Sequence, residues 1–168
     1  MKKRYSAVIL LSEDLTKVVL VHKKKPDWQK DKANFPGGKV EASDYRPEDT
    51  VVFWEHILYQ KCAIREVREE TGLIIDNPTL FCVLKYQEAE CHFFYYVGDI
   101  AKASTMEEEV IFIDTVNNVL NNRTMRFSPE HGTLPTIPNL SWLIAMALSH
   151  IKNSKLDSGS YLTIKTEE

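Results

Sequence analysis

The chain has 168 residues with 21 Lys plus Arg and 24 Asp plus Glu, giving a formal net charge of −3, and this length suits a single domain. Its 43% hydrophobic and 27% charged residues exclude a disordered or fibrous protein, and the near-neutral charge disfavours binding to duplex nucleic acid or a membrane surface. Three cysteines without metal-ligand spacing, and apolar runs too short for a signal peptide or a membrane span, predict a cytoplasmic protein with reduced thiols.

The first half of the chain predicts a hairpin, a glycine-rich loop and a long helix. Tyr5–Leu11 and Lys17–Val21 are rich in strand-forming residues and flank a polar turn, which is typical of two antiparallel strands. Charged residues over Lys23–Lys32 predict a solvated loop, and the Pro and two Gly residues within Asn34–Val40 predict a tight loop. Apolar residues then recur with a period of about 3.6 over Thr50–Thr71, which predicts one long helix or two joined helices.

The second half predicts further strands and two helices. Three segments rich in aromatic and β-branched residues are expected to complete a mixed sheet: Thr79–Tyr86, His92–Val97 and Glu109–Ile113. A short helix is expected over Thr115–Asn121 and a proline-containing loop over Arg123–Pro138. Asn139 is a favourable N-cap for a final helix, Leu140–Ile151, whose nearly all-apolar faces predict burial against the sheet.

The expected domain covers residues 1–151, and a polar tail covers 152–168. This tail is either frayed or adds an edge strand at Tyr161–Ile164. The histidines are expected to be structural and to form no cluster: His22, His56, His92, His131 and His150.

The segment Arg65–Glu70 is the most informative part of the sequence. Glu66, Glu69 and Glu70 stand at i, i+3 and i+4, so that three carboxylates share one face of the predicted helix. Like charges at this spacing destabilise a helix by about 0.2–0.5 kcal/mol per pair, and a hard divalent cation among the oxygens would relieve the repulsion. The absence of thiolates and imidazoles from this face favours Mg²⁺ or Mn²⁺ over zinc; a solvated charged face is the alternative.

The surrounding sequence favours the metal site. Phe35–Glu41 is a glycine loop able to approach a phosphate or a cation, and Gly72 stands where a helix would end. Together these segments resemble the signature of the Nudix hydrolases, a MutT-like family, and the second half of that signature is complete from Arg65 to Leu73. In the first half, the position of the family's glutamate falls on Asp44, and an insertion over about 45–57 follows.

This resemblance implies a Nudix-type α/β/α sandwich with a mixed sheet. It also implies a hydrolase, dependent on Mg²⁺ with Mn²⁺ as substitute, that cleaves the pyrophosphate linkage of a nucleoside diphosphate joined to another moiety. Nucleotide is the expected partner of a monomer or homodimer, and the rival activities are hydrolysis of ADP-ribose, of a dinucleotide polyphosphate or of an RNA cap. From another functional class, the rival is a non-catalytic Nudix-fold module that only binds nucleotide.

The resemblance assigns roles residue by residue. Glu69 and Glu70 are the implied metal ligands, with Glu66 as ligand or general base and the carbonyl of Gly37 or Gly38 as a further oxygen. Arg65 would orient the carboxylates and pair with an acidic residue, for which Asp44 is the implied partner and Glu48 and Glu55 are rivals. One member of the run Glu107–Glu109, taken as Glu108, is expected to complete the metal shell or to act as base.

A second resemblance concerns the substrate. Asn34 and Asn139 fall where the family members that clear oxidised purine nucleoside triphosphates contact the base, and such a substrate would yield a nucleoside monophosphate and pyrophosphate. The base could stack on Phe35 or Trp28, and Lys39 is expected near the substrate. The lysine run 23–25 could contact the phosphates. The alternatives are an N-cap role for Asn139 and ordinary solvation for the lysine run.

Overall fold

The computed structural model describes residues 2–45, 55–122, 124–128, 132–153 and 160–166. Most of the expected insertion, including Glu48, lies outside these ranges, as do His131 and the first part of the helix predicted from Thr50. The side chain of Glu55 is also outside the described part of the chain.

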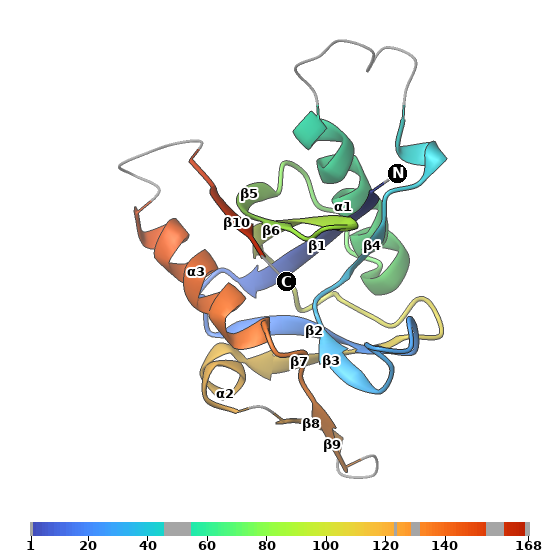
Figure 1. Cartoon of the computed structure of the whole chain (residues 1–168). Helices are drawn as coiled ribbons and strands as arrows, with labels where there is room; N and C mark the ends of the chain where they lie inside the picture. Colours follow the sequence, from blue (N-terminus) through green and yellow to red (C-terminus); the bar gives the residue numbers. More distant parts are fainter. Residues whose placement is uncertain (1, 46–54, 123, 129–131, 154–159, 167–168) are drawn as a thin grey trace.

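A mixed sheet, eight-stranded within the described ranges, is built around β1 (Lys3–Ser12) in the order β10-β5-β6-β1-β2-β3 (Figure 1). The strand β4 also pairs with β1, and β7 also pairs with β2. The bounds of the other strands are β2 Lys17–Lys23, β3 Lys32–Asn34, β4 Gly37–Lys39, β5 Thr79–Lys85, β6 Ala89–Gly98, β7 Val110–Thr115 and β10 Leu162–Lys165. The sheet is mixed because β1 runs antiparallel to β2 and β4 and parallel to β6.

The pairing of β1 determines where the glycine segment lies. Leu11 of β1 is aligned with Val18 of β2, whereas Tyr5 and Ala7 are aligned with Lys39 and Gly37 of β4. The segment predicted as a tight loop therefore contains the short strand β4. Near Leu11 the neighbour of β1 is β2, and near the N-terminal end of β1 the neighbour is β4. Its close approach needs glycine, since a Cβ at Gly37 would lie 2.6 Å from Ala7 Cα.

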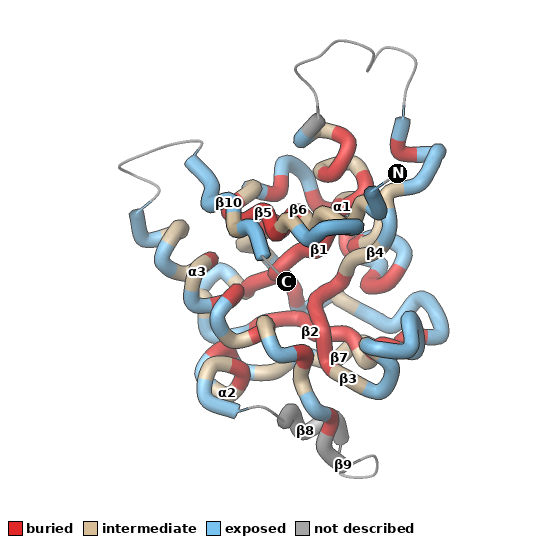
Figure 2. Tube along the Cα trace, viewed as in Figure 1, coloured by how far each residue is buried: buried red, intermediate tan, exposed pale blue. Residues whose placement is uncertain are grey.

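Helices cover both faces of the sheet, which gives the predicted α/β/α sandwich. On one face, Val8 and Leu10 of β1 pack in a cluster with Tyr59, Ala63 and Val67 of α1 (Glu55–Thr71). The alternate residues of β1 pack in a second cluster with α2 (Val116–Asn121) and α3 (Leu140–Asn153). This alternation follows from the two-residue period of a strand, and Figure 2 shows β1 and β2 buried between the helices.

The C-terminal third differs from the sequence expectations in two places and decides between two alternatives in a third. Only one face of α3 is buried, and Trp142 on another face is 37% exposed, so this helix is less enclosed than its composition predicted. The expected loop over Arg123–Pro138 contains a hairpin, β8 (Thr124–Ser128) and β9 (Gly132–Pro135). Of the two alternatives for the tail, the edge strand is found, as β10 pairs in parallel with β5.

Among the described residues no helix has the length and apolarity to cross a membrane.

Two histidines do come together, contrary to expectation. The Nδ1 atoms of His56 on α1 and His92 on β6 are 3.4 Å apart, and the His92 ring stacks on Tyr59 with centroids 3.5 Å apart. Burial lowers the pKa of His92 to about 4 despite its hydrogen bond with Glu90. The hydroxyl of Tyr161, just before β10, lies 2.9 Å from His56 Nε2 and ties the C-terminal segment to α1.

Candidate active site

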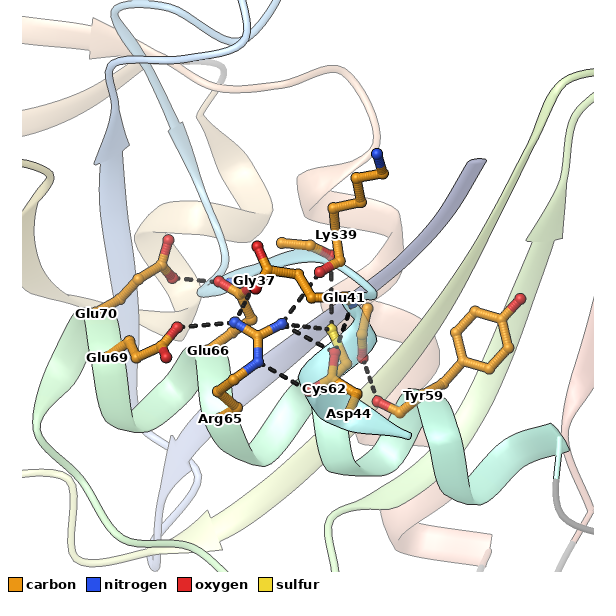
Figure 3. Close-up of polar contacts among 12 residues, drawn as sticks. Gly37, Lys39, Glu41, Asp44, Tyr59, Cys62, Arg65, Glu66, Glu69 and Glu70 are labelled. Carbon is orange, nitrogen blue, oxygen red and sulfur yellow. Dashed lines mark hydrogen bonds and ion pairs between the residues drawn. The ribbon is translucent and has the colours of Figure 1, made fainter. Parts of the chain in front are cut away.

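Three carboxylates project from α1 toward the glycine segment of β4, as the helical spacing predicted (Figure 3). Glu70 is 4% exposed, and its Oε2 accepts a hydrogen bond of 2.8 Å from the Gly37 N–H. Gly38 lies directly against Glu66, because a Cβ at position 38 would lie 2.5 Å from the Glu66 carboxyl carbon. Glu69 is the most exposed of the three carboxylates. The two glycines therefore allow backbone to approach the acidic face of α1.

Arg65 holds this acidic face in place through its guanidinium group (Figure 3). Its Nε and Nη2 donate to the two oxygens of Asp44 at 2.8 and 3.0 Å, which is the pairing that the family resemblance implied. Its Nη1 donates to Glu66 Oε1 and to Glu69 Oε2, both at 2.8 Å. A planar fork with several fixed donors is well suited to positioning carboxylates in this way.

Asp44 is buried and is held from both sides. It ends the short 3₁₀ turn Ala42–Asp44, and its Oδ2 accepts a 2.8 Å hydrogen bond from the Glu41 N–H. Burial opposes ionisation of Asp44, but the Arg65 guanidinium and the Glu41 N–H together lower its pKa below the usual value. The pairing thus holds although twenty residues separate the two partners in sequence.

A buried lysine reaches Glu70, the carboxylate that Arg65 does not contact. Lys23, the last residue of β2, is 5% exposed, and its Nζ donates to Glu70 Oε1, to Gly37 O at 3.1 Å and to Glu109 Oε2 at 2.9 Å. Burial alone would lower the pKa of Lys23, but the charges of Glu70 and Glu109 raise it, so the ammonium stays charged. Burial raises the pKa of Glu70 to about 7, against the opposing effects of Lys23 and the Gly37 N–H.

Glu109, and not the expected Glu108, is the member of the acidic run that reaches this group. Glu109 is 5% exposed, and its Oε1 accepts from the N–H groups of Lys24 and Lys25 at 2.9 and 3.3 Å. Although burial opposes ionisation, Lys23 and these N–H groups lower the pKa of Glu109. Glu107 and Glu108 are exposed.

A cavity of about 460 Å³ adjoins the glycine segment on the side of the predicted substrate residues. Asn34, Phe35, Asn139 and Trp28 all line it, together with Gly37 and Gly38. The Asn34 amide donates to Gln29 Oε1 at 2.7 Å and accepts from the Phe35 N–H at 2.7 Å. The Phe35 side chain is fully buried in the core, whereas Trp28 is 61% exposed, so Trp28 is the better placed of the two for stacking on a base. Lys39 does not line this cavity, and its side chain points away from the carboxylates (Figure 3).

The donor atoms gathered here match a hard divalent cation. They are carboxylate oxygens of Glu66, Glu69, Glu70 and Glu109 and the carbonyl of Gly37, which Lys23 Nζ contacts. Mg²⁺ and Mn²⁺ prefer such oxygen ligands. Within the described ranges no three His, Cys, Asp or Glu side chains already converge as a metal site. Arg65 pairs with Glu66 and Glu69, and Lys23 pairs with Glu70 and Glu109. The residues therefore fit the ion by chemistry.

No family model and no curated protein sequence matches the chain, but solved structures are similar to it over most of its length. A MutT structure described for Aliivibrio salmonicida and Vibrio cholerae is 20% identical, with a TM-score of 0.58 over 86% of this chain and 98% of that chain. The MutT protein of Bacillus halodurans is 19% identical, with a TM-score of 0.53 over 97% of this chain and 88% of that chain. The NUDIX domain of Shewanella oneidensis NrtR, solved with ADP ribose, is 14% identical, with a TM-score of 0.61 over 90% of this chain and 89% of that chain. The chain therefore has the fold of the Nudix hydrolases.

Proposed function

We propose that the chain is a Nudix-type hydrolase that depends on Mg²⁺, with Mn²⁺ as substitute, and cleaves the pyrophosphate linkage of a nucleoside diphosphate joined to another group. The proposal depends on one observation: the three carboxylates of Glu66, Glu69 and Glu70 gather beside the Gly37–Gly38 backbone (Figure 3). Arg65 orients Glu66 and Glu69, and the Gly37 N–H holds Glu70. The shared fold with MutT proteins supports the same conclusion.

In this proposal Glu69, Glu70 and the carbonyl of Gly37 or Gly38 hold the cation, and Glu109 completes its ligand set. When bound, Mg²⁺ neutralises charge on the phosphoryl oxygens and lowers the pKa of the attacking water. Arg65 orients Glu66 and Glu69, and Glu66 serves as a further ligand or as the general base. Burial raises the pKa of Glu66 despite the opposing Arg65 charge, which suits a group that accepts a proton.

The cavity beside the glycine segment is the proposed binding site of the base. Its volume of about 460 Å³ is within the range of small-molecule sites, and both Asn34 and Asn139 line it. An amide offers donors and acceptors to a purine edge, and Trp28 offers a stacking surface. A purine nucleoside triphosphate, yielding nucleoside monophosphate and pyrophosphate, is the first candidate substrate. ADP-ribose is the second, because the NrtR domain of the same fold was solved with ADP ribose.

The test is release of phosphate or pyrophosphate from a nucleotide panel that includes ADP-ribose, with and without Mg²⁺. Glu69→Gln removes one charge at almost constant volume and is expected to lower the rate about a thousandfold, since it removes a cation ligand. Glu13→Gln, in the exposed turn before β2, is the matched control and should leave the rate unchanged. Retention of more than about a tenth of the rate by Glu69→Gln would refute the assignment. Nucleotide binding without hydrolysis would instead identify a non-catalytic module.

Asn139→Ala tests the base site. It should lower kcat/KM for the preferred purine by roughly ten- to a hundredfold and leave a poor pyrimidine substrate nearly unaffected. Equal losses for both substrates would indicate a role in the helix start and not in base recognition.

A further inference from the structure

The three N–H bonds of the Lys23 ammonium are all directed at oxygens of the candidate cation site. The acceptors are Glu70 Oε1 from α1, Glu109 Oε2 from the segment before β7, and the Gly37 carbonyl from β4. We call these three oxygens the Lys23 cage. The Lys23 side chain is 6% exposed, so within the described structure its charge is balanced by protein oxygens and not by bulk water.

Each carboxylate of the cage has a second anchor that does not involve Lys23. The other oxygen of Glu70 accepts from the Gly37 N–H at 2.8 Å. The other oxygen of Glu109 accepts from the N–H groups of Lys24 and Lys25. Backbone N–H groups thus fix both carboxylates, while one oxygen of each is directed at a cation. The cage would keep its shape if that cation were exchanged.

We infer that Lys23 is an internal cation that competes with the divalent ion for the Glu70–Glu109–Gly37 oxygens and must leave the cage when the ion binds there. This inference depends on the proposed function, because it takes the cage to be part of the Mg²⁺ site. Lys23 Nζ already contacts all three oxygens, so an ion bound to the same three oxygens would have to take its place. An ammonium and a divalent ion beside each other in a buried site also repel one another. A lysine suits the exchange, as its ammonium is strongly hydrated and lies at the end of a flexible stem.

The first experiment measures Mn²⁺ binding by calorimetry, without substrate, to the wild-type chain, Lys23→Met and Lys24→Met. Methionine keeps the length of the side chain and removes the charge. Lys23→Met is expected to bind Mn²⁺ at least about tenfold more tightly, because the competing charge is gone. Lys24→Met is the matched control, since the Lys24 side chain is 42% exposed, lies 4.0 Å from Asp31 and does not enter the cage; its Mn²⁺ affinity should equal that of the wild type.

The outcomes separate this inference from the proposed function. Unchanged or weaker Mn²⁺ binding by a folded Lys23→Met protein, beside measurable binding by the wild type, would overturn the competition and leave the proposed function standing. No Mn²⁺ binding by any of the three proteins would overturn the proposed function, and the inference with it.

A second experiment uses the unaltered chain and so does not depend on the folding of a variant. Lysine amines are labelled with an acylating reagent, in chelator or in saturating Mg²⁺, and the modified peptides are quantified by mass spectrometry. Lys23 should be protected in chelator and should react at least several-fold faster in Mg²⁺, whereas Lys24 should react equally in both. Equal protection of Lys23 in both conditions, under which Mg²⁺ binding is confirmed by calorimetry, would overturn the inference.

Discussion

Gly38→Ala tests whether the position of the Glu66 carboxylate determines activity. The nearest atoms to the added Cβ all belong to the Glu66 carboxyl group, the closest carbon at 2.5 Å, so the side chain of Glu66 must move. Its displacement breaks the 2.8 Å hydrogen bond from Arg65 Nη1, which contributes about 1–2 kcal/mol. Replacing glycine by alanine also restricts the unfolded chain, which offsets about 0.4–1 kcal/mol of the lost stability. Gly38 has no positive φ, so alanine adds no backbone strain there.

The free energy of unfolding should therefore fall by about 1 kcal/mol or less. The rate should respond much more strongly, because a shift of about 1 Å in a reacting group can lower kcat/KM about a hundredfold. Gly37→Ala provides the contrasting variant. Its Cβ would lie 2.6 Å from Ala7 Cα, at a φ of +152°, so it meets the backbone of β1 and not a movable side chain. This variant should lose about 3 kcal/mol or more of stability.

Urea unfolding followed by tryptophan fluorescence gives the stability of each protein, and product release from the best substrate of the panel gives kcat/KM. The expected pattern is a stable, weakly active Gly38→Ala protein and an unstable Gly37→Ala protein. If Gly38→Ala kept the kcat/KM of the wild type, activity would not depend on the position of the Glu66 carboxylate. A Gly38→Ala protein as unstable as Gly37→Ala would show that the methyl group disturbs the backbone, contrary to the reasoning above.

Three further variants test other parts of the molecule. Asp44→Asn should cost about 1–3 kcal/mol in urea unfolding because it removes the buried charge that pairs with the Arg65 guanidinium. The exposed Asp76→Asn should stay within about 0.5 kcal/mol, and equal costs would refute the importance of the pair. Glu109→Gln should likewise lower the free energy of unfolding by about 1–3 kcal/mol, and Glu108→Gln by about 0.5 kcal/mol or less. A larger loss for Glu108→Gln than for Glu109→Gln would contradict this prediction. The imidazole of His92 should titrate by NMR near 4 and not near 6.5. Between pH 7 and pH 5 the imidazole of His92 is protonated in the unfolded chain but stays neutral in the folded chain. As the pH falls over this range, the free energy of unfolding of the wild type should therefore drop by about 2 kcal/mol relative to that of His92→Gln.

The acidic face of α1 could be predicted from sequence because it is a local property. Residues at i, i+3 and i+4 lie together on any helix, so the three glutamates needed no tertiary information. The pairing of Arg65 with Asp44 required the family resemblance, because spacing along the chain carries no signal across an insertion. Both partners lie on elements fixed by β4 and α1, and the chain between them does not determine their distance.

The other side of the site could not be predicted in the same way. Lys23 stands in a lysine run that is typical of a solvated loop, and its burial depends on β4 and on the segment before β7. One signal was available: Val19, Val21 and Lys23 alternate along β2, so Lys23 shares the face of two buried valines. Which glutamate of the acidic run points inward depends on where β7 begins, and a run of identical residues has no pattern to indicate that.

In the proposed function, the charges of the site would link cation binding to nucleotide binding. Within the described residues, two cationic side chains, Arg65 and Lys23, face a larger set of carboxylates: Asp44, Glu66, Glu69, Glu70 and Glu109. Two of the Arg65 donors bind Asp44. The negative charge of the four glutamates is therefore only partly neutralised by the two cationic side chains. A pyrophosphate group is itself anionic and is repelled from such a surface unless further positive charge arrives with it. Divalent ions and the nucleotide should therefore bind with positive coupling, each raising the affinity for the other. Lys23 keeps the carboxylates from repelling one another until that charge arrives.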